Sequence, residues 1–195
     1  MIKRLFDIFF SFAGLIILSP LFLIIAVFIK LDSKGPVFFR HERVGRNFKD
    51  FKLYKFRTMS ADAVNKALQI TVCGDKRVTK IGKFLRKYKI DELPQLINVL
   101  KGEMSFVGPR PEVRKYVELF KQDYKKLLKI RPGITDPASI KYSDEERVLA
   151  FSNNWEEDYI KKILPEKIKL ASQYVDKHNN IIVDLHLIFK TIFKI

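Results

Sequence analysis

The chain has 195 residues, of which 47% are hydrophobic and 30% are charged, and this suits one domain or one domain with an appendage. The 17 phenylalanines exclude a disordered chain, and the single cysteine, Cys73, excludes a disulfide scaffold. The formal net charge of +15 predicts an anionic partner, which can be membrane phosphate, nucleic acid or an anionic substrate.

The first element is an uncharged apolar run from Ile8 to Ile29. At about 1.5 Å per residue, a helix of this length could cross a hydrocarbon core of about 30 Å. The run is too long for the apolar region of a signal peptide, and no small-residue cleavage site follows it. A buried core helix is the alternative, but runs of this length are seldom needed inside so small a globule. The run therefore predicts a membrane segment.

Ser19 and Pro20 stand in the middle of this run. Because Pro20 has no amide hydrogen and clashes with the preceding turn, we expect a kink there, with the Ser19 hydroxyl bonded to a freed carbonyl. Each half is then too short to span alone. Basic residues flank the run on both sides: Lys3, Arg4, Lys30 and Lys34. A simple membrane span prefers basic residues on one side. The sequence therefore supports two interpretations equally: a re-entrant segment that enters the bilayer and returns, and an ordinary kinked span.

Two β-rich runs, 37–43 and 51–58, follow the membrane segment. The polar loop Gly45-Arg46-Asn47 between them predicts a β-hairpin. Ser60 is a candidate N-cap for a short helix that starts at Ala61.

The charged residues of the stretch 76–89 are all basic, and its apolar residues follow helical spacing. A basic amphipathic helix is typical of a membrane surface, although a solvated charged face would look the same. Further helices are expected over 112–129 and 155–177. The amphipathic C-terminus, 181–195, either packs on the core or lies in the bilayer interface. His186 is expected on its surface, and nothing pairs His41, His178 and His186 as a metal site.

Adjacent carboxylates, Asp91 and Glu92, stand next to the expected start of a helix that has Pro94 in its first turn. Because neighbouring side chains diverge on a helix, one carboxylate could attack a phosphorus while the other holds a divalent cation. On this pair alone, an acidic pair that merely stabilises the helix start is the favoured interpretation.

Several cations change that balance. The turn Gly108-Pro109-Arg110-Pro111 is stiff and projects Arg110, and Arg131-Pro132-Gly133 repeats the pattern. Lys55 and Arg57 share one face at the end of a strand. Singly, each cation suits a surface ion pair. Together they surround a candidate carboxylate nucleophile, which suits transfer of a phosphorylated group onto a lipid.

From about Lys3 to its C-terminus, the chain resembles the small monotopic phosphoglycosyl transferases, the bacterial sugar transferases that start glycan assembly on polyprenyl phosphate. The motifs that carry the resemblance are the apolar run with Ser19-Pro20, GPVFFRHERVGR, FKLYKFRTM, DKRVTKIGKFLRK, DELPQLINVLKGEMSFVGPRPE and RPGIT. Several ordered motifs at compatible spacing make the resemblance specific.

The resemblance implies a reaction. A sugar-1-phosphate passes from a UDP-sugar to polyprenyl (undecaprenyl) phosphate, and UMP leaves. Asp91 matches the aspartate that forms a covalent phosphosugar intermediate, and Glu92 matches the glutamate that binds Mg²⁺. This would be the first membrane step in the assembly of an exopolysaccharide, capsule, O-antigen or glycoprotein. Neither the sugar nor the pathway is predicted.

The resemblance also implies a fold and a location. The fold class is α+β and predominantly helical, with a re-entrant membrane helix over 1–34 that is kinked at Ser19-Pro20. A cytoplasmic catalytic domain over 35–195 would hold a small β-hairpin and amphipathic interfacial helices around the active site. The protein would be monotopic, on the cytoplasmic face of the bacterial inner membrane. Its implied partners are a UDP-sugar, polyprenyl phosphate and phospholipid but no nucleic acid, and both a monomer and a homodimer stay open.

Basic positions that match family motifs are assigned to phosphate or nucleotide contacts: Lys55, Arg57, Arg86, Arg110 and Arg131, with Arg43 as a further candidate. Two features depart from the family. Lys89 stands where many members have serine, and the stretch 136–142 replaces a common Trp-Ala-Gln-Val-Asn-Gly-Arg motif. We expect this stretch to shape sugar or nucleotide choice.

Two other classes of function remain as alternatives. An inactive, membrane-anchored lipid-binding or scaffold relative would not need Asp91, Glu92 and Arg110 together. A nucleic-acid binder would explain the charge of +15, but the sequence shows no readout motif and the apolar run would be unexplained. We therefore favour the transferase.

Overall fold

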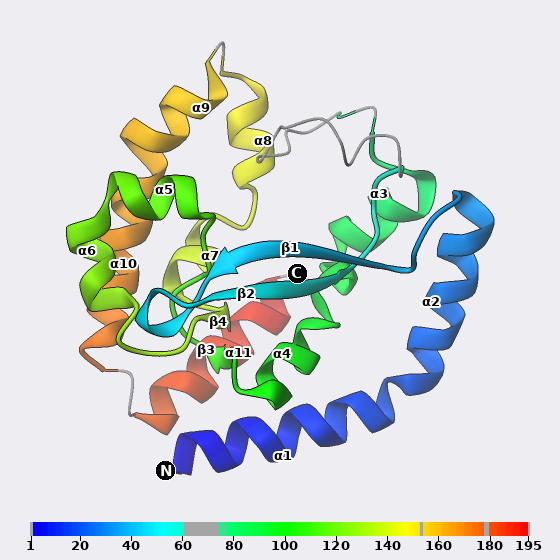
Figure 1. Ribbon diagram of the computed structural model, residues 1–195, viewed down its shortest axis with the longest axis horizontal. Helices are drawn as coiled ribbons and strands as arrows, with labels where there is room; N and C mark the ends of the chain where they lie inside the picture. Colours follow the sequence, from blue (N-terminus) through cyan, green and yellow to red (C-terminus); the bar gives the residue numbers. More distant parts are fainter. Residues whose placement is uncertain (1, 61–74, 76, 153, 178–179, 195) are drawn as a thin grey trace.

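The computed structural model of the chain describes residues 2–60, 75, 77–152, 154–177 and 180–194 (Figure 1). These residues are mostly helical, with one two-stranded antiparallel sheet and one short parallel strand pair. The predicted predominance of helices and the small sheet are confirmed. The helix predicted from Ala61 lies outside the described residues.

Two helices, α1 (Ile2–Ile17) and α2 (Ser19–Asp32), make up the N-terminal segment. They meet at an angle of 59°, and Figure 1 shows α1 along one edge of the molecule with α2 turning away from it. Pro20 lies in the first turn of α2, where its missing amide hydrogen costs no helical hydrogen bond. The Ser19 hydroxyl donates to the carbonyl of Ile16 at 2.7 Å.

No single helix in the described part of the chain is long and apolar enough to cross a membrane, but α1 and α2 together meet that test as a bent pair. Large apolar side chains of both helices are exposed: Ile2, Leu5, Phe9, Phe12, Ile16, Ile17, Leu23, Ile24, Val27, Phe28 and Leu31. Insertion of this pair into a membrane, and the division into 1–34 and 35–195, stay predictions.

The predicted hairpin forms from β1 (Phe38–Val44) and β2 (Asp50–Phe56). The strands pair antiparallel, with Phe39 opposite Lys55 and Arg43 opposite Phe51. The polar loop between them folds into a 3₁₀ turn, η1 (Arg46–Phe48), in which Asn47 takes a left-handed conformation. The register places His41 and Arg43 on the same face of the sheet as Lys55.

The basic helix is shorter than predicted. It runs as α3 (Lys80–Lys87) and starts late because Thr79 is its N-cap and accepts a hydrogen bond from the amide of Gly82. A 3₁₀ turn, η3 (Ile90–Glu92), then leads into α4 (Gln95–Lys101), and Gly102, with φ of 85°, ends α4.

Two short strands, β3 (Ser105–Val107) and β4 (Gly133–Thr135), pair in parallel, and the sequence did not predict this pair. Between them, the helix predicted over 112–129 is broken into α5 (Arg114–Leu119) and α6 (Lys121–Leu127). The break lies at Phe120, whose φ of −118° and ψ of 38° are not helical.

After β4, α7 (Pro137–Lys141) and α8 (Glu145–Ala150) precede the helical stretch predicted over 155–177. That stretch forms α9 (Trp155–Asp158), a π-helix η4 (Tyr159–Ile163) and α10 (Leu164–Val175). Pro165, at the start of α10, has no amide hydrogen to donate to a carbonyl in the preceding turn. The helical hydrogen-bond pattern therefore changes next to it, where η4 ends. The chain ends in α11 (Ile181–Lys194), as predicted.

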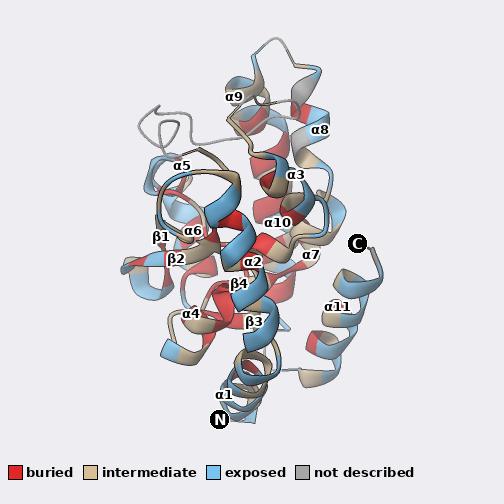
Figure 2. Ribbon diagram, turned by 90° about the vertical axis from the view of Figure 1, so that its right-hand side faces the viewer, coloured by how far each residue is buried: buried red, intermediate tan, exposed pale blue. Residues whose placement is uncertain are grey.

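The largest core cluster lies among α5, α6, η4 and α10 and contains the buried rings of Tyr116, Tyr124 and Tyr159. Figure 2 shows this core in red, while α2 and α11 carry mostly exposed and intermediate residues. Exposed apolar side chains also line α11: Ile182, Leu185, Phe189, Ile192 and Phe193. Contiguous exposed apolar surface of this kind marks a membrane or protein contact.

Candidate active site

Asp91 and Glu92 occupy η3, at the junction between the basic helix α3 and helix α4. Lys89 makes this junction by adopting a left-handed conformation, with φ of 53°. Strand β2 lies beside η3 and brings Lys55 to the two carboxylates. The adjacent acids of the sequence thus lie beside a cation from a distant strand.

Glu92 is the centre of an ion network. Lys55 Nζ lies 2.7 Å from Glu92 Oε1 and 4.0 Å from Asp91 Oδ2. Arg110 Nη2 donates to the same Glu92 oxygen at 2.5 Å, and its Nη1 lies 3.4 Å from Oε2. Glu92 therefore binds both cations, whereas Asp91 has a looser contact with one of them.

The pKa values of the two carboxylates are shifted in opposite directions. Asp91 is only 7% exposed, and burial raises its pKa to about 6 against the opposing charge of Lys55. Burial would raise the pKa of Glu92 as well, but Arg110 and Lys55 hold it well below its usual range. At neutral pH both are ionised, and Asp91 is a poorly solvated carboxylate, which favours nucleophilic attack.

Arg110 is positioned by two interlocked turns. The amide of Gly108 donates to Thr135 O at 3.0 Å, and the amide of Gly133 donates to Pro109 O at 3.0 Å. The Asp136 carboxylate accepts from the backbone amide of Arg110 at 3.4 Å and from the amide of Ser139 at 2.7 Å. The stretch that departs from the family motif thus begins by supporting Arg110.

Two further predicted cations lie near this network. The charge of Arg86, on α3, is among those that lower the pKa of Asp91 against the larger effect of burial. Arg43, on β1, lies within electrostatic range of Glu112, Arg110 and Glu92, although burial is the main cause that lowers its own pKa. The structure therefore brings Lys55 and Arg110 into contact with these carboxylates, with Arg86 within electrostatic range of Asp91 and Arg43 within range of Glu92.

Two predicted phosphate contacts lie elsewhere. Arg57 is 3% exposed, and its Nη2 donates to Ile29 O at 3.2 Å and to Ser33 O at 2.6 Å, so it binds the end of α2 to β2. Arg131 Nε donates to Gly102 O at 2.7 Å, just after α4. Both guanidiniums bind backbone carbonyls, and in the part of the chain that the structure describes neither contacts Asp91.

Arg4 completes the support of α4 from the N-terminal segment. Its Nη1 donates to Val99 O at 2.7 Å and its Nη2 to Leu100 O at 3.1 Å. These carbonyls lie in the last turn of α4, at its negative dipole end, where Val99 O also accepts from the amide of Gly102 at 3.0 Å. The helix that follows Asp91 and Glu92 is therefore fixed to α1, a contact that no sequence motif indicated.

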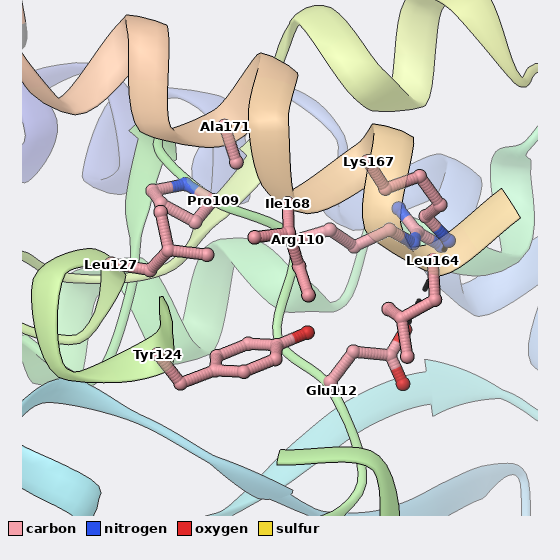
Figure 3. A pocket seen from close by; sticks show the side chains of 9 residues that line it. All are labelled: Pro109, Arg110, Glu112, Tyr124, Leu127, Leu164, Lys167, Ile168 and Ala171. Atoms are coloured by element: carbon pink, nitrogen blue, oxygen red, sulfur yellow. Dashed lines mark ion pairs between the residues drawn. The ribbon is translucent and has the colours of Figure 1, made fainter. Parts of the chain in front are cut away.

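A buried polar network close to Arg110 was not predicted from the sequence. Lys167 Nζ donates to Glu145 Oε2 at 2.8 Å and to the Tyr159 hydroxyl at 3.2 Å, and that hydroxyl donates to Glu112 Oε1 at 2.8 Å. Figure 3 shows Arg110, Glu112 and Lys167 around a small cavity whose other walls are the Tyr124 ring with its hydroxyl and five apolar residues. Its volume of about 20 Å³ suits a water molecule and no substrate.

The described residues hold no group of three or more His, Cys, Asp or Glu side chains that could bind a metal. Glu92 nevertheless offers one ionised carboxylate beside Asp91. Mg²⁺ usually takes one or two carboxylates and completes its shell with water and substrate phosphate. This donor set fits a metal that binds together with a phosphorylated substrate, and does not fit a cage built from protein alone.

His41→Gln is expected to flatten the loss of stability on acidification. Burial, aided by the charges of Arg43 and Lys55, lowers the pKa of His41 from 6.5 to about 4. Between these values the unfolded chain binds a proton that the native state does not. The free energy of unfolding therefore falls with falling pH, by up to about 1.4 kcal/mol per pH unit.

Denaturant unfolding of the detergent-solubilised protein between pH 7 and 4.5 measures this effect. His186→Gln, on an exposed position of α11, is the matched control and is expected to keep the pH dependence of the unmodified protein. Equal pH dependence in His41→Gln and in the unmodified protein would contradict the burial of a neutral His41.

The sequence pattern of the family described as "Bacterial sugar transferase" matches residues 1–195. The chain is 39% identical over 98% of its length to UDP-N-acetylgalactosamine-undecaprenyl-phosphate N-acetylgalactosaminephosphotransferase of Aeromonas hydrophila. It is 42% identical over 98% of its length to UDP-glucose:undecaprenyl-phosphate glucose-1-phosphate transferase of Klebsiella pneumoniae.

A shorter relative, a putative undecaprenyl-phosphate N-acetylgalactosaminyl 1-phosphate transferase of Bacillus subtilis, is 47% identical over 63% of the chain and 68% of the relative. By contrast, the chain spans only 43% of the Aeromonas protein and 39% of the Klebsiella protein. The similarity to these two covers nearly all of this chain but less than half of each relative.

Proposed function

This chain belongs to the bacterial sugar transferase family, and we propose that it transfers a sugar-1-phosphate from a UDP-sugar to polyprenyl phosphate with release of UMP. The observation that supports this most is the buried carboxylate of Asp91 beside the ion network of Glu92, Lys55 and Arg110. Relatives that cover almost the whole chain carry names that specify transfer of a sugar phosphate to undecaprenyl phosphate.

In the first step, an oxygen of the Asp91 carboxylate attacks the phosphorus that bears the sugar. A new O–P bond forms, and the bond from that phosphorus to the oxygen of UMP breaks, so that UMP leaves with the electron pair. Lys55 contacts both carboxylates and Arg110 contacts Glu92. Both cations would exchange Glu92 for the phosphate oxygens, where they offset the developing charge. Splitting the transfer in this way lets one small site serve two large substrates.

In the second step, a phosphate oxygen of the polyprenyl phosphate attacks the same phosphorus. The O–P bond to Asp91 breaks, the carboxylate regains its electron pair, and the lipid carries the phosphosugar through a diphosphate. Burial raises the pKa of Asp91, which by itself makes the carboxylate a poorer leaving group, and the nearby charges of Lys55 and Arg110 oppose this effect by stabilising the carboxylate that is set free. No proton has to be moved in either step.

Glu92 would hold Mg²⁺, with water and substrate phosphate as the remaining ligands. When bound, Mg²⁺ supplies charge neutralisation for the phosphates. The exposed apolar faces of α1, α2 and α11 support attachment to a membrane. We propose that this is the cytoplasmic face of the bacterial inner membrane, with α1 and α2 as a re-entrant pair. The positive net charge supports contact with anionic lipid.

Glu92→Gln is expected to lower turnover by about 10- to 100-fold and to shift half-maximal activity to higher Mg²⁺ concentration. The change keeps the shape of the side chain but removes the charge that would hold the metal. Activity titrated against Mg²⁺ measures both effects. Glu118→Gln removes a carboxylate from an exposed ion pair of α5 and is the control, which is expected to leave the Mg²⁺ titration unchanged. An unchanged Mg²⁺ titration in Glu92→Gln would contradict the metal role.

The proposed function is tested by supplying the purified, detergent-solubilised protein with undecaprenyl phosphate, Mg²⁺ and a panel of UDP-sugars. Release of more than one UMP per protein molecule that requires the lipid, together with a lipid-linked sugar phosphate, is the expected result, and it identifies the sugar. UMP release without any lipid-linked product would contradict transfer and indicate a hydrolase.

A further inference from the structure

A basic pocket lies between strand β1 and the start of helix α5, two elements that Figure 1 shows next to each other. Its lining comes from Arg40–Arg43 of β1, from the first part of β2 and from 113–115. Its volume is about 530 Å³, which falls within the range of about 300–1,000 Å³ that small-molecule sites occupy. The cavity behind Arg110, at about 20 Å³, offers no such room.

The charge of this pocket favours an anion. Two of its cations are already paired, Arg114 with Asp50 at 2.7 Å and Lys115 with Glu156. Three more lining cations, Arg40, Arg43 and Lys52, have no ion-pair partner in the part of the chain that the structure describes. Glu42 and Asp50 are the acidic groups in the lining, so cations remain in excess.

Arg43 connects the pocket to the candidate active site. It lines the pocket, and it also lies within electrostatic range of Arg110 and Glu92. Its neighbour His41 is within range of Lys55. The buried Nη1 of Arg43 has no hydrogen-bond partner among the described residues. A buried guanidinium nitrogen without a partner is costly, and a ligand oxygen would relieve that cost.

We propose that this pocket binds the nucleoside monophosphate half of the sugar nucleotide donor, with Arg43 on the phosphate that leaves. The inference rests on the proposed transfer reaction and assigns a place to the group that this reaction expels. When the phosphorus bearing the sugar is attacked, the nucleoside monophosphate departs with the electron pair of the broken P–O bond. Arg43 then meets the negative charge that develops on the departing oxygen.

The geometry separates the two substrates. The pocket takes no residue from α1 or α2, the bent apolar pair. A water-soluble nucleotide would therefore enter along β1, while a lipid phosphate would approach from the helices with exposed apolar faces. The two substrates would meet at Asp91 and Glu92, which Lys55 and Arg110 contact.

The test is binding of UMP to the full-length, detergent-solubilised Asp91→Asn protein, measured by calorimetry, because this background does not turn over donor. Arg43→Gln and Lys52→Glu are added singly, and each is expected to weaken UMP binding by about 10- to 100-fold. Arg43→Lys is expected to recover part of the loss. Lys125→Glu, an exposed position of α6 outside the pocket, carries the same charge change as Lys52→Glu and is expected to leave binding unchanged.

Lys52 is exposed, so Lys52→Glu reports on binding even where Arg43→Gln perturbs folding. Unchanged UMP affinity in both variants would overturn the inference, as would an equal loss in Lys125→Glu. Displacement of UMP by an equal concentration of inorganic phosphate would also overturn it, because the pocket would then be a general anion site. Lipid-linked product formed by the unmodified protein is measured separately. The proposed transfer reaction can therefore be confirmed even if the proposed nucleotide pocket is wrong.

Discussion

Asp91→Asn is expected to lower turnover by about 10⁴-fold or more, because the amide cannot form the covalent bond to phosphorus. It is also expected to raise the free energy of unfolding at pH 7, by about 1–3 kcal/mol. Burial raises the pKa of Asp91 to about 6, so at neutral pH the native state holds an ionised carboxylate at a cost that a neutral amide avoids. Lost activity with gained stability separates a catalytic defect from misfolding.

Turnover and denaturant unfolding of the same preparation measure the two effects. Asp123→Asn, at an exposed position of α6, is the matched control and is expected to change neither quantity appreciably. Normal turnover of Asp91→Asn would exclude Asp91 as the nucleophile. Loss of both activity and stability would instead indicate a structural role for the carboxylate.

Gly133→Ala is expected to destabilise the protein by about 3 kcal/mol or more and to lower its Tm by about 6–12 °C. Gly133 and Gly108 face each other where the two turns around Arg110 interlock. A Cβ atom on Gly133 would lie 2.0 Å from the Gly108 amide nitrogen and 2.5 Å from its carbonyl oxygen. Both contacts are to backbone, so relief requires the turns to separate, and Arg110 would lose its position against Glu92.

Gly14→Ala is the matched control, because the added Cβ would lie 3.3 Å from the flexible end of Leu96 and that side chain can move. Thermal unfolding in detergent, with turnover of the folded fraction, compares the two variants. Equal Tm values for Gly133→Ala and the unmodified protein would contradict the close packing of the two turns.

The parts of the fold that the sequence predicted are those with local signals. The hairpin follows from two β-rich runs around a polar loop, and β1 and β2 lie within the predicted runs to within one or two residues. The C-terminal helix follows from its amphipathic spacing. The parallel pair of β3 and β4 could not be predicted, because each strand has three residues and its partner is distant in the chain. The breaks at Phe120 and at the π-helix depend on packing that no periodicity reports.

The candidate site was predictable at its carboxylates and less so at its cations. Asp91 and Glu92 are adjacent in sequence, so the turn that carries one necessarily carries the other. A guanidinium, in contrast, binds phosphate oxygens and backbone carbonyls with the same geometry. The sequence therefore could not distinguish Arg110, which reaches Glu92, from Arg57 and Arg131, which bind carbonyls at the ends of helices. Lys89 is close to the site in sequence, but nothing local indicated its left-handed turn.

The central claim, a covalent phosphosugar on Asp91, is tested most directly by mass spectrometry of the protein after incubation with its UDP-sugar and Mg²⁺ in the absence of lipid acceptor. The account predicts a mass increase of one sugar phosphate on the peptide that contains Asp91, and its loss when undecaprenyl phosphate is added. Lipid-linked product formed without any such adduct, or an adduct on another residue, would contradict it.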